Sequence, residues 1–201
     1  MSTLFAWVVA ASSLLAPSRQ HDALAEAIAT RAEAEAPLFK GDDDRRKTSA
    51  LLVAIAFRES SLRADAVGDH VAGKPTSFCA FQLHLPFDHK TAEGWTAAEL
   101  VEDPTKCVTA AMRMLRESMR MCPAHPLAFY AAGPIGCENA RAQRISRDRM
   151  AIAQQLLRRV PVIDEPAPGA SAPGVPLIPV PEKSVATRPA AARPRLFCGG
   201  A

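Results

Sequence analysis

Hydrophobic positions recur with helical spacing through most of the first 160 residues. Residues 20–36 are rich in Ala and Glu and precede a proline, which predicts an amphipathic helix. A longer helix is predicted over 103–121, with Asp103 as its cap and Pro104 in its first turn. Further helices are predicted over 96–100, over 146–160, from Thr48 or Ser49 to about Glu59, and over 125–137 with a break at Gly133 and Pro134. No long run alternates as a strand would, so the predicted fold class is all-α.

One stretch departs from this helical pattern. Residues 64–90 are rich in Gly, Pro, Asp and His and predict a long irregular loop. A loop of that length inside a compact domain is usually functional. Residues 40–48, "KGDDDRRKT", predict a shorter charged loop.

Glu59 stands on an apolar helical stripe. Leu52, Ile55, Ala56 and Glu59 follow the spacing i, i+3, i+4 and i+7, which places the carboxyl on the face that should meet the core. In one interpretation the helix frays there and the side chain turns to water. In the other, the carboxyl is held beside apolar groups, where desolvation raises its pKa and lets it carry a proton near neutral pH.

The chain divides by composition into three parts. Residues 1–19 form an apolar segment that is similar to the apolar part of a signal peptide. No Lys or Arg precedes its apolar run, however, and the alternative is a buried first helix. Residues 20–160 form the predicted domain. Residues 161–201 hold nine of the 17 prolines and predict a disordered, Pro-rich and Ala-rich tail with polyproline II character.

Charge and cysteine content narrow the functional classes. The chain has 24 basic and 21 acidic residues, and its late arginines suit either an anionic cell-envelope surface or a solvated helix face. Aromatic residues make up only 5% of the chain, so no nucleic-acid partner is predicted. Four cysteines in the domain and a fifth, Cys198, favour export to an oxidising compartment. There is no C-x-x-C or H-E-x-x-H motif, so neither a metal nor another cofactor is predicted.

Four short motifs carry a resemblance. Four motifs occur in order between residues 45 and 157: "AIAFRESS", "ADAVGD", "AFQ" and "FYAAG". Together they resemble the superfamily of lytic transglycosylases and goose-type lysozymes, which implies a lysozyme-like helical domain. The resemblance matches Glu59 to the catalytic acid, Ser60 to its neighbouring serine, Gln82 to a sugar-cleft glutamine and Tyr130 to a tyrosine near the acid. Two departures are "CAFQ" in place of G-L-M-Q, and Ala131 in place of the asparagine that usually follows the tyrosine.

The resemblance also implies a substrate and a reaction. One glutamate would protonate the leaving sugar of a peptidoglycan strand and then take the proton of the C6 hydroxyl, giving a 1,6-anhydro ring. Such an enzyme would act as a monomer without a cofactor. Asp65 and Asp69 are the closest further acids in sequence, and either one at about 5–9 Å from Glu59 would favour hydrolysis instead. A wall-binding module without activity is the alternative from another class.

The four domain cysteines allow three pairings. We predict Cys79 with Cys107, which would tie the cleft loop to the helix behind it, and Cys122 with Cys137, which would close the segment that carries Tyr130.

Overall fold

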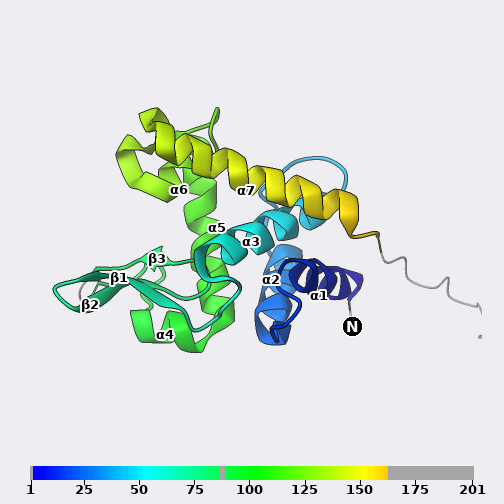
Figure 1. The fold of residues 1–201 in the computed structure, drawn as a ribbon, viewed down its shortest axis with the longest axis horizontal. Coiled ribbons are helices and arrows are strands. Elements are labelled where there is room, and N and C mark those ends of the chain that lie inside the picture. The colour runs from blue at the N-terminus through cyan, green and yellow to red at the C-terminus, as the bar shows by residue number, and fades with distance from the viewer. Residues whose placement is uncertain (1, 87–88, 163–201) are drawn as a thin grey trace, which may run out of the picture. The chain divides into compact units, whose positions relative to one another are not determined.

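The computed structural model describes residues 2–86 and 89–162, and within them the chain is mainly α-helical, as predicted. Its elements (Figure 1) are α1 (Thr3–Leu15), α2 (Asp22–Ala34), α3 (Asp44–Ser60), β1 (Val67–Val71), β2 (Lys74–Phe78), β3 (Leu83–His84), α4 (Ala97–Glu102), α5 (Pro104–Met121), α6 (Ala128–Ala132), the 3-10 helix η1 (Gly133–Glu138) and α7 (Ala140–Arg159).

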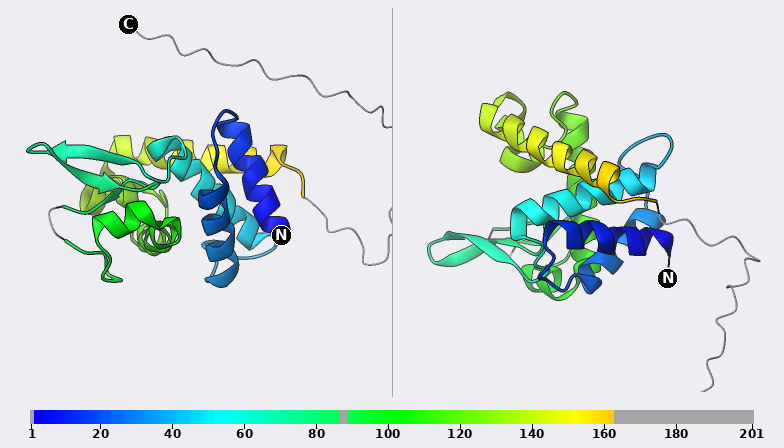
Figure 2. Two further views of the ribbon diagram at one scale, coloured as in Figure 1. Left: turned by 90° about the horizontal axis from the view of Figure 1, so that it is seen from below. Right: turned by 45° about the vertical axis from the view of Figure 1, so that its right-hand side comes forward.

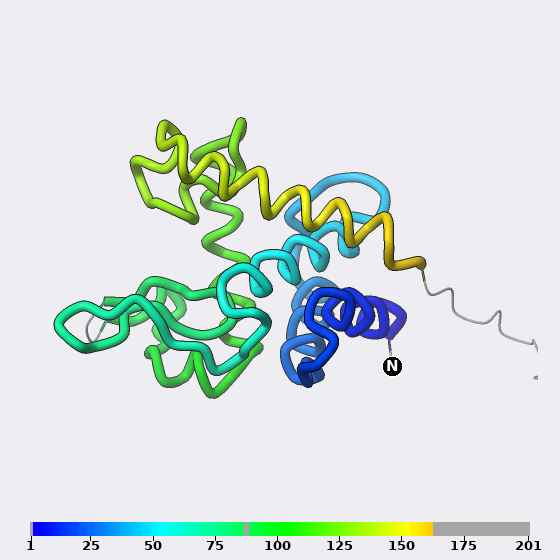
Figure 3. The backbone as a smooth tube through the Cα atoms, in the orientation of Figure 1, coloured from blue at the N-terminus to red at the C-terminus, as the bar shows by residue number. Residues whose placement is uncertain are grey.

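Helix α3 is the central element of the core. Every residue from 48 to 56 is buried, so this helix is covered on all sides rather than along one stripe. Helices α1, α2 and α7 pack against it, and α7 runs beside it (Figure 3). Helix α5 packs against α2 and α6 and buries Val108, Ala111, Met112 and Leu115. Glu59 lies three residues beyond this fully buried stretch, in the last turn of the helix.

Two helices are longer than predicted. Helix α3 begins at Asp44 rather than at Thr48, because Thr48 does not cap it. The Thr48 hydroxyl donates to the carbonyl of Asp44 and accepts from the amide of Leu38, at 2.8 and 2.9 Å. Helix α7 begins at Ala140, where Asn139 caps the amides of the first turn. The predicted charged loop is correspondingly shorter.

The prediction of a wholly irregular segment over 64–90 is wrong, because it contains a three-stranded antiparallel sheet in the order β1-β2-β3. The hairpin turn consists of Ala72 and Gly73, both with positive φ, and Val71 pairs with Lys74. Most residues of β1 are exposed, so the strand lacks the alternating pattern that sequence can reveal. The hairpin extends from the end of the molecule opposite α1 (Figure 2).

Both predicted disulfides are present. Cys79 is bonded to Cys107 and Cys122 to Cys137, with Cα–Cα distances of 6.2 and 5.3 Å. The first ties the segment after β2 to α5, and the second joins the end of α5 to η1. Two such bonds are compatible with a secreted protein.

The apolar N-terminal segment forms α1, which packs against α2 and α3. Trp7, Val8 and Ala11 are buried, in keeping with the alternative of a buried first helix. The indole of Trp7 donates to the carbonyl of Val160 at 3.1 Å, which fixes the end of α7 onto α1. The predicted tail was residues 161–201, and from residue 163 onward it lies outside the described residues. None of the helices in the described part of the chain combines the length and apolar character of a membrane span.

Candidate functional site

A cleft of about 710 Å³ opens at the end of α3, between the sheet and the α6–α7 region. The polar residues lining it come from segments far apart in sequence. They are Glu59, Asp69, Ser77, Gln82, His84, Tyr130, Arg141 and Arg149. Three of the four residues matched by the resemblance, Glu59, Gln82 and Tyr130, are thus brought together.

Glu59 is held in the last turn of α3. The helix ends one residue later at Ser60, and the left-handed backbone of the C-cap Ser61 lets its amide donate to the carbonyls of Ala56 and Phe57. The Glu59 side chain is 20% exposed and accepts a hydrogen bond from Arg149. Burial raises the pKa of the Glu59 carboxyl, Arg149 lowers it, and the charge of Asp69 raises it, with a net shift upward. The carboxyl is thus held rather than frayed into water.

Ser60 does not belong to the cleft. Its hydroxyl donates to the carbonyl of Ala56 at 3.0 Å, and the residue is buried. Successive side chains of a helix point about 100° apart, so Glu59 and Ser60 do not share a face. Its placement supports a role in the helix rather than contact with a ligand.

Tyr130 supports the site through its ring. Its hydroxyl donates to the carbonyl of Phe81, across from α6 to the segment after β2. The guanidinium of Arg149 lies over the ring, 6.0 Å from its centroid. Burial raises the pKa of the Tyr130 hydroxyl well above its usual value, and the charge of Glu59 acts in the same direction. The raised pKa keeps Tyr130 neutral, and its hydroxyl donates to Phe81 rather than to Glu59.

Gln82 is positioned by the backbone around it. The side-chain nitrogen Nε2 of Gln82 donates to the carbonyl of Cys79 at 3.1 Å, and the backbone φ of Gln82 is 48°. The side-chain oxygen lies so close to Gly68 that a Cβ there would be 2.3 Å away. Gly68 in β1 therefore makes room for Gln82 at the cleft.

Asp69 is the further acid that lines the cleft. The hydroxyl of Ser77 donates to its carboxylate at 2.7 Å, across the β1–β2 pair. As a nearby negative charge, Asp69 raises the pKa of the Glu59 carboxyl. Asp65 instead lines a different pocket with Arg19 and His21.

Arg149 is a cleft residue that the sequence analysis did not identify, because the late arginines suited an anionic surface or a solvated helix face. Arg149 is only 7% exposed. A signal was present in the sequence: Ala142, Ser146, Arg149, Ala153 and Leu156 follow a helical stripe, and all five are buried. Arg149 thus interrupts the apolar stripe of α7 as Glu59 interrupts that of α3.

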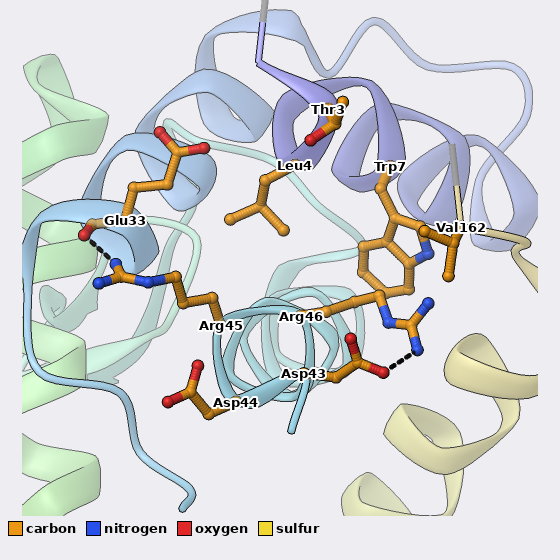
Figure 4. A pocket seen from close by; sticks show the side chains of 9 residues that line it. All are labelled: Thr3, Leu4, Trp7, Glu33, Asp43, Asp44, Arg45, Arg46 and Val162. Atoms are coloured by element: carbon orange, nitrogen blue, oxygen red, sulfur yellow. Dashed lines mark hydrogen bonds and ion pairs between the residues drawn. The ribbon is translucent and has the colours of Figure 1, made fainter. Parts of the chain in front are cut away.

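A second pocket, of about 350 Å³, lies where α1 meets the start of α3 (Figure 4). Its charged groups bind one another: Arg46 pairs with Asp43, and Arg45 donates to the carbonyl of Glu33. Glu59 lies 15 positions after Asp44, which corresponds to about 22 Å of helix, so this pocket is remote from the cleft.

Within residues 2–86 and 89–162, no three His, Cys, Asp or Glu side chains gather closely enough to hold a metal ion. Comparisons with family models, curated proteins and solved structures gave no significant match. The residues of the cleft and the motif resemblance are therefore the features from which a function is inferred.

Proposed function

We propose that this protein cleaves the glycosidic bond between N-acetylmuramoyl and N-acetylglucosamine residues of peptidoglycan, on a lysozyme-like fold. Glu59 is the general acid and base. The observation that carries the proposal is the largely buried Glu59 carboxyl, which has a raised pKa and lies in a cleft with Gln82 and Tyr130. A carboxyl with a raised pKa keeps its proton to higher pH than an ordinary glutamate, and such a proton can be given to a leaving sugar oxygen.

The reaction proceeds in two steps. Protonated Glu59 gives its proton to the glycosidic oxygen as the bond to the muramoyl ring breaks, and positive charge develops on that ring. The resulting carboxylate then takes the proton of the C6 hydroxyl, which closes a 1,6-anhydro ring. General acid help of this kind contributes roughly 10² to 10⁴-fold to the rate.

Asp69 favours a second outcome, hydrolysis, in which water attacks in place of the C6 hydroxyl. It lines the cleft with Glu59, and its carboxylate is oriented by Ser77. Glycosidases that use water commonly have two carboxyl groups. A muramidase is therefore the alternative that the structure supports.

Digestion of purified sacculi tests the proposal. Mass spectrometry should find anhydromuramoyl ends if the enzyme is a lytic transglycosylase and reducing ends if it is a muramidase. Glu59→Gln should lower turnover by about 10²-fold or more, whereas Glu102→Gln, at an exposed carboxyl of α4, should not. Binding to sacculi without turnover between pH 4 and 9 would contradict the proposal and establish a wall-binding module.

The cellular location follows from the same proposal. Peptidoglycan lies outside the cytoplasmic membrane, and the two disulfides are compatible with that compartment. We propose an exported protein that contacts the cell envelope and acts as a monomer. Peptide mapping without reductant should recover both disulfide-linked peptides.

A further inference from the structure

Two consecutive residues of α3 pair with two consecutive residues of α7. Arg58 donates twice to Asp148, at 2.7 Å each, and both side chains are nearly half exposed. Next to this pair, Arg149 donates from Nη2 to Oε1 of Glu59, and these side chains are 9% and 20% exposed. Asp148 is thus bound by Arg58 on the exposed side, while the buried guanidinium of the adjacent Arg149 binds Glu59.

We propose that Arg149 is a positioning residue that determines which oxygen of Glu59 carries the proton. The hydrogen bond to Oε1 makes that oxygen an acceptor in both protonation states. The proton of the acid form therefore resides on Oε2. The ring of Tyr130 lies against the guanidinium and keeps it in place.

The proposed function gives this arrangement its use. The proton leaves Oε2 for the glycosidic oxygen, the electron pair of the broken bond goes to that oxygen, and Arg149 retains all its own protons. The negative charge then left on Glu59 already faces a fixed cation, so no group must reorient as the proton moves. In the second step the same cation holds the carboxylate while Oε2 accepts a proton.

Other charged and titratable groups surround Glu59. Asp69 of β1 raises the pKa of Glu59, whereas Arg149 lowers it. Tyr130 of α6 is neutral. His84 of β3 and Arg141 of α7 line the same cleft. In the described part of the chain, Nε and Nη1 of Arg149 are buried without a hydrogen-bond partner. Its attachment to the site thus depends on Glu59 and Tyr130, so the surroundings of the Arg149 guanidinium should change when Glu59 gains or loses its proton.

Carboxyl-labelled glutamate NMR on the full chain tests this coupling without requiring activity. Glu59 is assigned by loss of its signal in Glu59→Gln. In the wild type, the Nε–H resonance of Arg149 should move with the same midpoint as the Glu59 carboxyl. Independent midpoints, or an Arg149 signal that does not respond, would overturn the proposal even if no variant of Arg149 folds.

Variants extend the test to the reaction. Arg149→Gln should raise the Glu59 midpoint by roughly one unit or more and lower kcat/KM by about 10²-fold through misplacement, mainly in kcat. Arg149→Lys should retain most of the midpoint but not the rate, because it keeps the charge and loses the planar donor. Arg58→Gln removes only the exposed pair and should change the Glu59 midpoint little.

The two proposals fail in different ways. An unchanged midpoint in Arg149→Gln would overturn the role of Arg149 whatever the turnover. A wild type whose Arg149 signal follows the protonation of Glu59 but which cleaves no glycan would overturn the proposed function, and with it the catalytic use of this pair.

Discussion

Gly136 is the position where one added methyl group should test the support of the cleft. It is buried in η1, and a Cβ there would lie 2.0 Å from the carbonyl oxygen of Ala128 and 3.0 Å from Cα of Phe129. These are backbone atoms of α6, so no side-chain rotation can relieve the contact. Helix α6 is also anchored, because the Tyr130 amide donates to Ser118 at 2.9 Å.

Two opposing effects set the magnitude of Gly136→Ala. The backbone φ at Gly136 is outside the left-handed region, so alanine alone would be favourable by about 0.5–1 kcal/mol. Overpacking against a rigid neighbour costs about 1–3 kcal/mol, and contact with backbone places this substitution toward the upper end. We expect the free energy of unfolding to fall by about 1–2 kcal/mol, which lowers Tm by about 2–4 °C per kcal/mol.

Urea unfolding of Gly136→Ala measures this change, with Glu138→Ala as the matched control. Glu138 is exposed in the same 3-10 helix, so its substitution should stay within about 0.5 kcal/mol of the wild type. The slope with urea should not change, because the surface exposed on unfolding is the same. A Gly136→Ala protein as stable as the wild type would refute the close approach of η1 to α6.

Three further predictions follow from the core and the site. The folded-state pKa of Glu59 is raised, so its contribution to stability is complete below its ordinary value of 4.5 and is lost as pH rises through the raised pKa. Urea titrations should therefore show the unfolding free energy of the wild type falling relative to Glu59→Gln over that window, by up to about 1.4 kcal/mol per pH unit; a rising difference would contradict it. Replacing both cysteines of the pair separated by 15 residues, Cys122 and Cys137, with alanine should cost about 3 kcal/mol, and unchanged urea unfolding would count against the bond. Truncation after Val162 should leave cleavage of soluble glycan fragments within about twofold of the full chain. Truncation after Arg159 should lower the unfolding free energy by about 1–3 kcal/mol, because the Trp7 indole then loses its acceptor, the carbonyl of Val160. Equal stability of the two truncated proteins would contradict this.

Glu59 shows what the sequence could reveal. Its position on an apolar stripe follows from helical periodicity, and the structure keeps it on a largely buried face. The same test applied to α7 would have found Arg149, because both residues interrupt stripes of small or apolar residues. The arginine content of that helix instead suggested a solvated face, since most of its other arginines are indeed exposed.

The sheet and Asp69 could not be obtained in the same way. Strand β1 exposes most of its residues, so its sequence carries little alternation. The Ala-Gly turn also differs from the Asn-Gly and Asp-Gly pairs that identify hairpins most strongly. The place of Asp69 in the cleft depends on this hairpin and on the hydroxyl of Ser77, a contact across strands that periodicity does not encode.

The pairing of Glu59 with Arg149 explains how both helices tolerate a charge on a buried stripe. Either residue alone would pay an uncompensated desolvation cost, and their contact across 90 positions of sequence offsets part of it. The compensation is incomplete on the acid, because burial and Asp69 together outweigh Arg149 and leave the pKa of Glu59 raised. Glu59 is also the more exposed partner, at 20% against 9%. A fully neutralised carboxylate would hold no proton to give, so the proposed chemistry requires this imbalance: a cation close enough to orient Glu59, within surroundings that still favour its acid form.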